Sequence, residues 1–170
     1  ELKIFSLNLR VSVDKLSPMK ALIQRVSHAK VEVDGKVVSQ IGEGILTFLG
    51  LEKEDTEKEC EKLIQKIIEF RIFEDEQGKM NHSLLDQNKE HLIVSQFTLA
   101  ADCRKGKRPS FDRAQKPDLA KKLYEKAIEV SQKRGVSTAG GVFQADMKVS
   151  LTNEGPVTFM LECVSKEVQE

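Results

Sequence analysis

The first third of the chain alternates apolar and polar residues in a pattern typical of β-strands. Residues 20–51 are rich in β-branched side chains and glycine, and Val31 and Val33 precede an Asp34-Gly35 pair. Asp-Gly readily adopts the positive φ angles of a two-residue turn, so this stretch predicts a hairpin that continues at Val37. The continuous apolar run Ile45–Leu51 predicts a buried central strand.

The hydrophobic period then changes to that of a helix. Between Asp55 and Phe70 the apolar residues fall at helical spacing, with Asp55 or Thr56 as N-cap. These apolar residues are Cys60, Leu63, Ile64, Ile67 and Ile68. A short strand at 70–73 and a polar turn at 76–78 are expected to follow.

The second half of the chain repeats this alternation of strand and helix. Residues His91–Leu99 predict a second buried strand, and residues 100–117 a long loop. Asp118–Lys133 predicts an amphipathic helix whose apolar face carries Leu119, Leu123, Ala127 and Val130. Two strands, at 147–151 and 157–161, flank a predicted turn at 152–156. The order of elements indicates an α/β protein, a layered mixed fold with curved β-sheets and two main helices packed on them.

Composition limits the class of protein. The chain has 170 residues, 39% of them hydrophobic and 32% charged, which is typical of one soluble globular domain. The formal net charge of zero argues against indiscriminate binding of long nucleic acid. Three cysteines without CxxC spacing favour free thiols in a reducing cytosol.

We expect three parts in the chain. Residues 1–18 are either an N-terminal extension or upstream sequence, and they lack the apolar core of a signal peptide. Residues 19–164 form a single domain, and residues 165–170 form a tail. No apolar run is long enough to span a bilayer, so no membrane partner is expected.

The usual catalytic and metal-binding motifs are missing, and we expect neither a metal nor a cofactor. Two polar segments remain as candidates for a site. Ser95–Leu99 ends a buried strand, and Asn153–Thr158 contains a Gly-Pro bond that can be cis. Composition alone favours ordinary strand-end and turn residues at both places.

A third segment is basic. Residues 102–122 hold eight basic and three acidic side chains, a local net charge of +5, concentrated around Arg104–Arg108. Such a segment is either a phosphate contact or a solvated loop, and the sequence does not choose between them.

These segments together resemble the D-aminoacyl-tRNA deacylase family over residues 19–163. The motifs SQFTLAAD, KGKRPSF and NEGPVTF, in this order and spacing, carry the resemblance, supported by MKALIQRVSHAKVEVDG, IGEGILTFLGLEKEDT, FRIFEDEQGKMN and GVFQADMKVS. The resemblance implies a layered α/β fold and a cytoplasmic hydrolase that removes D-amino acids, and mischarged glycine, from tRNA. It also implies a homodimer with the active site at the subunit interface, aminoacyl-tRNA as partner, no DNA, and no metal.

The resemblance also implies roles for individual residues. The catalytic segment consists of Ser95, Gln96, Phe97 and Thr98. A cis Gly155-Pro156 motif enters from the opposite subunit and is held by Arg25. Phe143, Met147 and Ala114 lie near the adenosine pocket. The chain departs from the family pattern at Gln144, where glycine or alanine is expected, so the shape of the adenosine pocket there is open.

The residues are compatible with two mechanisms of ester hydrolysis. Thr98 is a possible nucleophile, but no base is visible beside it. We prefer the hypothesis that the substrate's own 2′-hydroxyl orients the attacking water and that Thr98 positions the ester. The competing functions are a dimeric RNA-binding module without catalysis, which the basic loop would serve, and a hydrolase of other D-amino acid esters. Equal rates on aminoacyl-adenosine and on tRNA would favour the latter.

Overall fold

A computed structural model describes residues 18–163, so the predicted extension and tail lie outside the described residues except for Pro18. The main sheet has six strands in the order β2-β1-β3-β6-β7, with β8 also paired to β1. The strands are β1 (Met19–Val33), β2 (Lys36–Ile41), β3 (Gly44–Gly50), β6 (Glu90–Ser95), β7 (Thr138–Gly140) and β8 (Lys148–Cys163). A separate small sheet pairs β4 (Phe73–Glu74) with β5 (Met80–His82).

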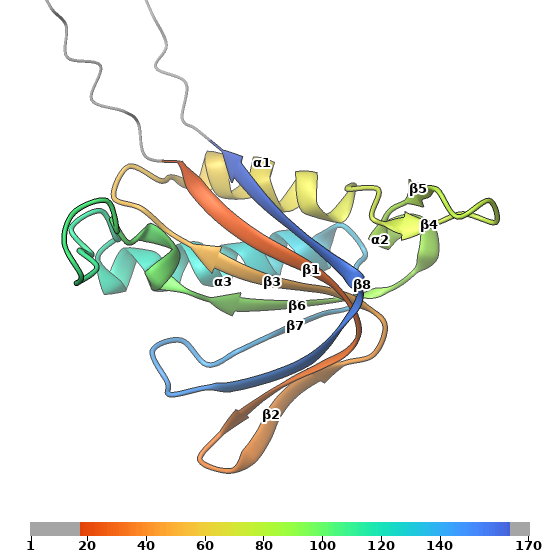
Figure 1. Cartoon of the computed structure of the whole chain (residues 1–170), viewed down its shortest axis with the longest axis horizontal. Helices are drawn as coiled ribbons and strands as arrows, with labels where there is room; N and C mark the ends of the chain where they lie inside the picture. Colours follow the sequence, from red (N-terminus) through yellow and green to blue (C-terminus); the bar gives the residue numbers. More distant parts are fainter. Residues whose placement is uncertain (1–17, 164–170) are drawn as a thin grey trace, which may run out of the picture.

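The length of β1 makes the sheet curve. Its first half pairs with β3, its second half pairs with β2, and β8 follows it along both halves. One long strand therefore joins two parts of the sheet, which bends around as Figure 1 shows. The hairpin between β1 and β2 turns at Asp34 and Gly35, both at positive φ, which confirms the predicted turn.

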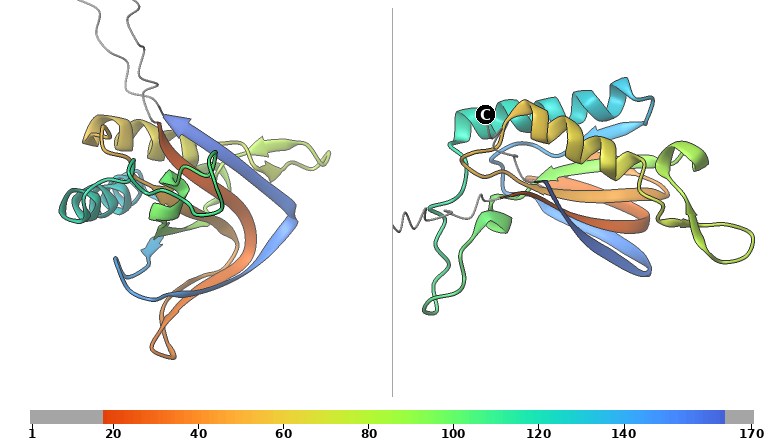
Figure 2. Two further views of the ribbon diagram at one scale, coloured as in Figure 1. Left: turned by 60° about the vertical axis from the view of Figure 1, so that its left-hand side comes forward. Right: turned by 90° about the horizontal axis from the view of Figure 1, so that it is seen from above.

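The two long helices cover one face of the sheet (Figure 2). Helix α1 (Glu57–Ile68) begins at Thr56, which forms a capping box with Glu59, and it buries the five predicted apolar residues. Helix α3 (Pro117–Lys133) packs against α1. Short helical segments, α2 (Leu84–Gln87) and η1 (Phe97–Ala100), complete the fold. The predicted α/β class and the two main helices are confirmed.

The prediction that Leu119 lies on the buried face of α3 is wrong. Leu119 is 48% exposed, whereas the buried face is centred on Ala120, Leu123, Tyr124 and Ala127. Each step of four residues rotates the helix surface by about 40°, so Leu119 lies beside this face rather than on it.

Two predicted boundaries also differ from the structure. The second buried strand ends at Ser95, and the chain turns into η1 instead of extending to Leu99. Residues 152–156 do not reverse the chain, because β8 runs through them and pairs with β1 on both sides. The Gly155-Pro156 bond is cis, as the sequence allows, and the segment forms a bulge in place of the predicted turn.

Two buried titratable groups respond to pH in opposite directions. His91 is fully buried, with Nε2 2.7 Å from Thr47 Oγ1 and Nδ1 2.9 Å from Ser131 Oγ, and burial lowers the pKa of its imidazole to about 3. Burial raises the pKa of Asp55 to about 7, although its carboxylate accepts a hydrogen bond from the Glu52 backbone. His91 therefore loses stabilisation as pH falls from about 6.5 towards 3, and Asp55 loses it as pH rises from about 4 to 7.

Replacing either group is expected to reveal the effect of the other. In His91→Gln, the free energy of unfolding should fall as pH rises from about 4 to 6.5, because of these two buried groups only Asp55 remains. In Asp55→Asn it should fall as pH decreases over the same window, by at most about 1.4 kcal/mol per pH unit. Urea unfolding at several pH values measures both slopes. Slopes of the same sign in the two variants would contradict these assignments.

Candidate active site

A cavity of about 530 Å³ opens where β3 and β6 end. These neighbouring strands are parallel, so their carboxyl ends meet at the same edge of the sheet, where ligands commonly bind in α/β proteins. Leu49 and Val94 contribute apolar surface, while Ser95, Gln96 and Phe97 lie along the lining. A cavity of this size and mixed lining accommodates a small organic ligand such as a nucleoside.

The turn beside the cavity is fixed by its contact with β3. The Gln96 N–H donates to the Leu49 carbonyl over 2.8 Å, and the Leu99 N–H closes the turn on the Gln96 carbonyl. Gly50 permits this approach, because a Cβ there would lie 2.6 Å from the Leu99 Cβ. Lys20 Nζ donates to the Leu99 carbonyl over 3.3 Å. Residues 95–99 are therefore held from both sides.

Thr98 lies on η1 and is exposed, and it is not part of the cavity lining. Its hydroxyl accepts a hydrogen bond of 2.6 Å from the Gln96 side-chain amide. Within the part of the chain that the structure describes, no carboxylate or imidazole hydrogen-bonds to this hydroxyl. Phe97 and Thr98 are the first two residues of the helical turn η1. The first N–H groups of a helix have no acceptor within the helix, so these two N–H groups have none within η1.

The opposite wall of the cavity comes from the loop between β7 and β8. Phe143 and Met147 line it, and Ala114 lines it from the segment before α3. The Phe143 ring lies 5.9 Å from the ring of Tyr124, whose hydroxyl donates to the Ile93 carbonyl. Gln144 also lines the cavity and has a φ of 64°, a conformation that glycine adopts most easily. Of the two residues expected at this position, glycine and alanine, this backbone conformation favours glycine.

Arg25 and the Gly155-Pro156 bulge form a second cluster that does not line this cavity. Along the ladder, Gln24 faces Thr158 and Val26 faces Asn153, so Arg25 alone opposes the four residues of the bulge. Arg25 is 9% exposed, and its Nε donates to the Glu154 carbonyl over 3.0 Å. Its other nitrogens bind the Ile72 carbonyl (2.9 Å) and the Glu74 carboxylate (3.2 Å).

Gly155 is required by this geometry. It has a φ of +137°, and a Cβ on it would lie 2.6 Å from Val157 Cγ2 and 2.9 Å from the Val157 nitrogen. The Val157 N–H donates to the Asn153 side chain over 2.9 Å, which fixes the other end of the bulge. Gly155 and Pro156 are both exposed. The bulge therefore presents a backbone held in place by Arg25 and Asn153.

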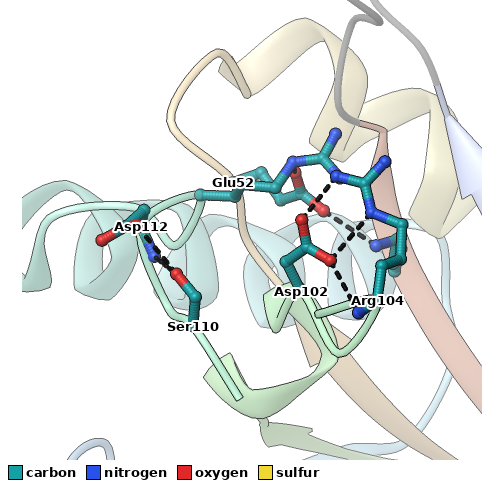
Figure 3. A network of polar contacts seen from close by, with 7 residues as sticks. Glu52, Asp102, Arg104, Ser110 and Asp112 are labelled. Atoms are coloured by element: carbon teal, nitrogen blue, oxygen red, sulfur yellow. Dashed lines mark hydrogen bonds and ion pairs between the residues drawn. The ribbon is translucent and has the colours of Figure 1, made fainter. Parts of the chain in front are cut away.

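The basic loop is anchored by a buried carboxylate that sequence reasoning missed. Glu52 is fully buried, 2.9 Å from Lys20 Nζ and 3.5 Å from Arg113 Nε, although neither contact has hydrogen-bond geometry. Figure 3 shows Glu52 beside the base of the loop and the pairing of Asp102 with Arg104. This pairing lowers the pKa of the Asp102 carboxyl. Glu52 and its two partners come from positions 52, 20 and 113, so no local motif reveals their contact.

Among residues 18–163, no group of three or more His, Cys, Asp or Glu side chains is arranged to hold a metal ion. In the same range, no helix is long and apolar enough to cross a membrane. The three cysteines are unpaired, as expected, with Cys60 buried and Cys103 exposed.

Comparison with known proteins matches nearly the whole described chain. The family model described as D-Tyr-tRNA(Tyr) deacylase matches residues 22–162. A D-aminoacyl-tRNA deacylase from Geobacter sulfurreducens is 55% identical over 148 residues, which cover 87% of this chain and 97% of that protein. A solved structure named c-Myc DNA Unwinding Element Binding Protein is 42% identical, with a TM-score of 0.81, and covers 86% of this chain and 100% of its own. Another, of a probable eukaryotic D-amino acid tRNA deacylase, has a TM-score of 0.76 at 18% identity and supports the fold.

The fold and the cavity define an α/β protein with a cavity at the carboxyl ends of two parallel strands. With the matches above, the chain belongs to the D-Tyr-tRNA(Tyr) deacylase family and is an enzyme of that class.

Proposed function

We propose that this chain hydrolyses the ester between a D-amino acid and the terminal adenosine of tRNA, releasing the free amino acid and tRNA. It acts as a single domain over residues 19–164 and proofreads translation in the cytoplasm. The observation that carries the proposal is the position of Ser95, Gln96 and Phe97 on a cavity of about 530 Å³ whose opposite wall holds Phe143 and Met147. The apolar wall suits the adenine, and the polar segment suits the ester.

The chemistry requires little from the protein, because an aminoacyl ester is already activated. Water attacks the carbonyl, and donors must stabilise the developing oxyanion. The N–H groups of Phe97 and Thr98 supply these donors. Since the Thr98 hydroxyl contacts an amide and not a base, we assign it to positioning the ester, and we assign activation of water to the substrate's 2′-hydroxyl.

Rejection of L-amino acids is the more demanding task. Apolar pockets discriminate weakly between similar side chains, so a fixed obstacle is more effective than attraction to the D side chain. The carbonyl groups of Gly155 and Pro156 bind the α-amino group and occupy the space that an L side chain needs. Arg25 and Asn153 hold this backbone in place. Such a site accepts many D side chains and also accepts glycine, which has no side chain to reject.

The same geometry supports a homodimer. Gly155 and Pro156 are exposed and do not line the cavity of their own chain, so a second copy must bring them to it. Phe159 and Met160, on the same strand, are 36% and 48% exposed, which suits a subunit contact. Strand β8 pairs with β1 alone among the described strands, which leaves its other edge available.

Mixing two inactive variants tests the shared site. Gln96→Ala/Thr98→Ala removes groups on the cavity side, and Gly155→Ala distorts the bulge. After unfolding and refolding together, random pairing places one intact site in each mixed dimer, so activity on D-Tyr-tRNA should return to about one quarter of wild type. Each variant refolded alone serves as the control. No recovery, with mixed dimers demonstrated by a mass tag, would contradict a site built from two subunits.

A further inference from the structure

Two large aromatic side chains are exposed side by side next to the cavity. Phe97 is 59% exposed and Phe111 is 39% exposed, and their ring centroids lie 5.0 Å apart at an angle of 57°. They come from different segments, since Phe97 is on η1 and Phe111 follows the basic loop. Exposure of apolar rings is unfavourable in water, so an exposed pair at the edge of a ligand cavity suggests a binding function.

The loop next to this pair carries positive charge that the described residues do not neutralise. Arg104 is paired with Asp102, but Lys105, Lys107 and Arg108 are exposed and make no ion pair with any residue from 18 to 163. In Figures 1 and 2 the loop projects from the body of the molecule. These three cations are therefore available to an anionic partner.

The base of the loop is fixed although its tip projects. Asp102 and Ser110 exchange two backbone hydrogen bonds, of 2.8 and 3.0 Å. The Lys53 N–H donates to the Arg113 carbonyl over 3.0 Å, and Arg113 also contacts the buried Glu52. Phe111 lies between these anchors, so its ring is presented in a defined place beside Phe97.

We propose that the Phe97–Phe111 pair and the three loop cations form a binding surface for the single-stranded 3′ end of RNA. A base next to the nucleotide in the cavity stacks on the exposed rings, and Lys105, Lys107 and Arg108 contact the phosphates that follow. Unpaired bases on aromatic side chains beside cations are the usual arrangement for single-stranded nucleic acid. This inference rests on the proposed function, since it extends the same site outward from the terminal adenosine.

The aromatic part is tested by Phe111→Ala, with Phe111→Tyr as the variant that keeps a stacking ring. Phe111→Ala should weaken binding of uncharged tRNA about tenfold, and Phe111→Tyr should bind as wild type does. Phe111 does not line the cavity, so D-tyrosyl-adenosine is too short to reach its ring, and hydrolysis of this substrate should stay within twofold in both variants. Equal loss on the short substrate, or wild-type tRNA affinity in Phe111→Ala, would overturn the stacking role.

The charged part is tested by the triple variant Lys105→Gln/Lys107→Gln/Arg108→Gln. Affinity for uncharged tRNA should fall at least tenfold at 0.1 M salt, and the slope of log Kd against log salt should decrease by about 2. The matched control is Lys58→Gln/Lys62→Gln/Lys66→Gln, which removes the same charge from exposed positions on α1. Equal effects of the two triple variants, or an unchanged salt slope, would overturn the assignment of this loop.

These measurements separate the inference from the proposed function. Binding of uncharged tRNA reports on the surface without any chemistry, whereas hydrolysis of D-tyrosyl-adenosine reports on the cavity alone. If wild type fails on the short substrate and on D-Tyr-tRNA alike, the proposed reaction is wrong. If both are hydrolysed and the variants bind tRNA normally, only the binding surface is wrong.

Discussion

Replacing Gly155 with alanine is expected to slow hydrolysis of D-Tyr-tRNA at least about 100-fold. The added Cβ would lie 2.6 Å from Val157 Cγ2 and 2.9 Å from the Val157 nitrogen, and the φ of +137° is strained for any residue with a side chain. The bulge must shift, and a displacement of about 1 Å in a positioning group can cost about 100-fold in rate. Single-turnover deacylation measures this loss.

Gly35→Ala is the matched control for this substitution. Gly35 also has a positive φ, of +74°, but nothing lies within 4 Å of an added Cβ. It lies in the β1–β2 hairpin, far along the chain from the Gly155-Pro156 bulge. We expect a small loss of stability in Gly35→Ala and a rate within twofold of wild type. A Gly155→Ala enzyme that hydrolyses D-Tyr-tRNA at the wild-type rate would exclude the bulge from the site.

Removing the 2′-hydroxyl from the terminal adenosine is expected to nearly abolish hydrolysis. If that hydroxyl orients or activates the attacking water, its loss should cost about 10²–10⁴-fold, the usual contribution of a positioned acid or base. The measurement compares D-Tyr-tRNA ending in adenosine with D-Tyr-tRNA ending in 2′-deoxyadenosine, both esterified at the 3′-oxygen. The deoxy analogue should still inhibit hydrolysis of the ribose substrate, which shows that it binds.

Full activity on the deoxy substrate would indicate that Thr98 is the nucleophile. Its hydroxyl would then have to attack the ester itself, despite having only the Gln96 amide as a side-chain partner among the described residues. A covalent acyl-enzyme trapped on Thr98 would accompany that result. The two mechanisms therefore give opposite outcomes in the same assay.

Much of the fold could be predicted from local patterns. The apolar face of α1, its start at Thr56 and the run that becomes β3 depend on residues close in sequence, and the structure confirms all three. The turn predicted at residues 152–156 is wrong. Turn-forming residues indicate that a regular strand is interrupted, but they do not distinguish a bulge within one strand from a turn that reverses the chain. Pairing of both halves of β8 with β1 decides this, and it depends on contacts between residues more than 115 positions apart.

The parts of the candidate site that lie in continuous sequence motifs could be predicted, and the parts formed by contacts between distant residues could not. The segment from Ser95 to Thr98 and the Gly155-Pro156 pair stand out as polar segments, but their roles come from the resemblance and stay predictions. Glu52 was missed, because a buried carboxylate between Lys20 and Arg113 leaves no spacing pattern in the chain. The pairing of Phe97 with Phe111 was missed for the same reason, since the long loop separates them.

The most direct test of the central claim compares D-Tyr-tRNA with L-Tyr-tRNA at one enzyme concentration. We expect rapid loss of the D ester while the L ester decays no faster than it does without enzyme. Hydrolysis of Gly-tRNA should accompany the D activity, because glycine has no side chain for the bulge to exclude. Equal hydrolysis of the D and L esters, or of neither, would contradict a deacylase whose Gly155-Pro156 backbone rejects L-amino acids.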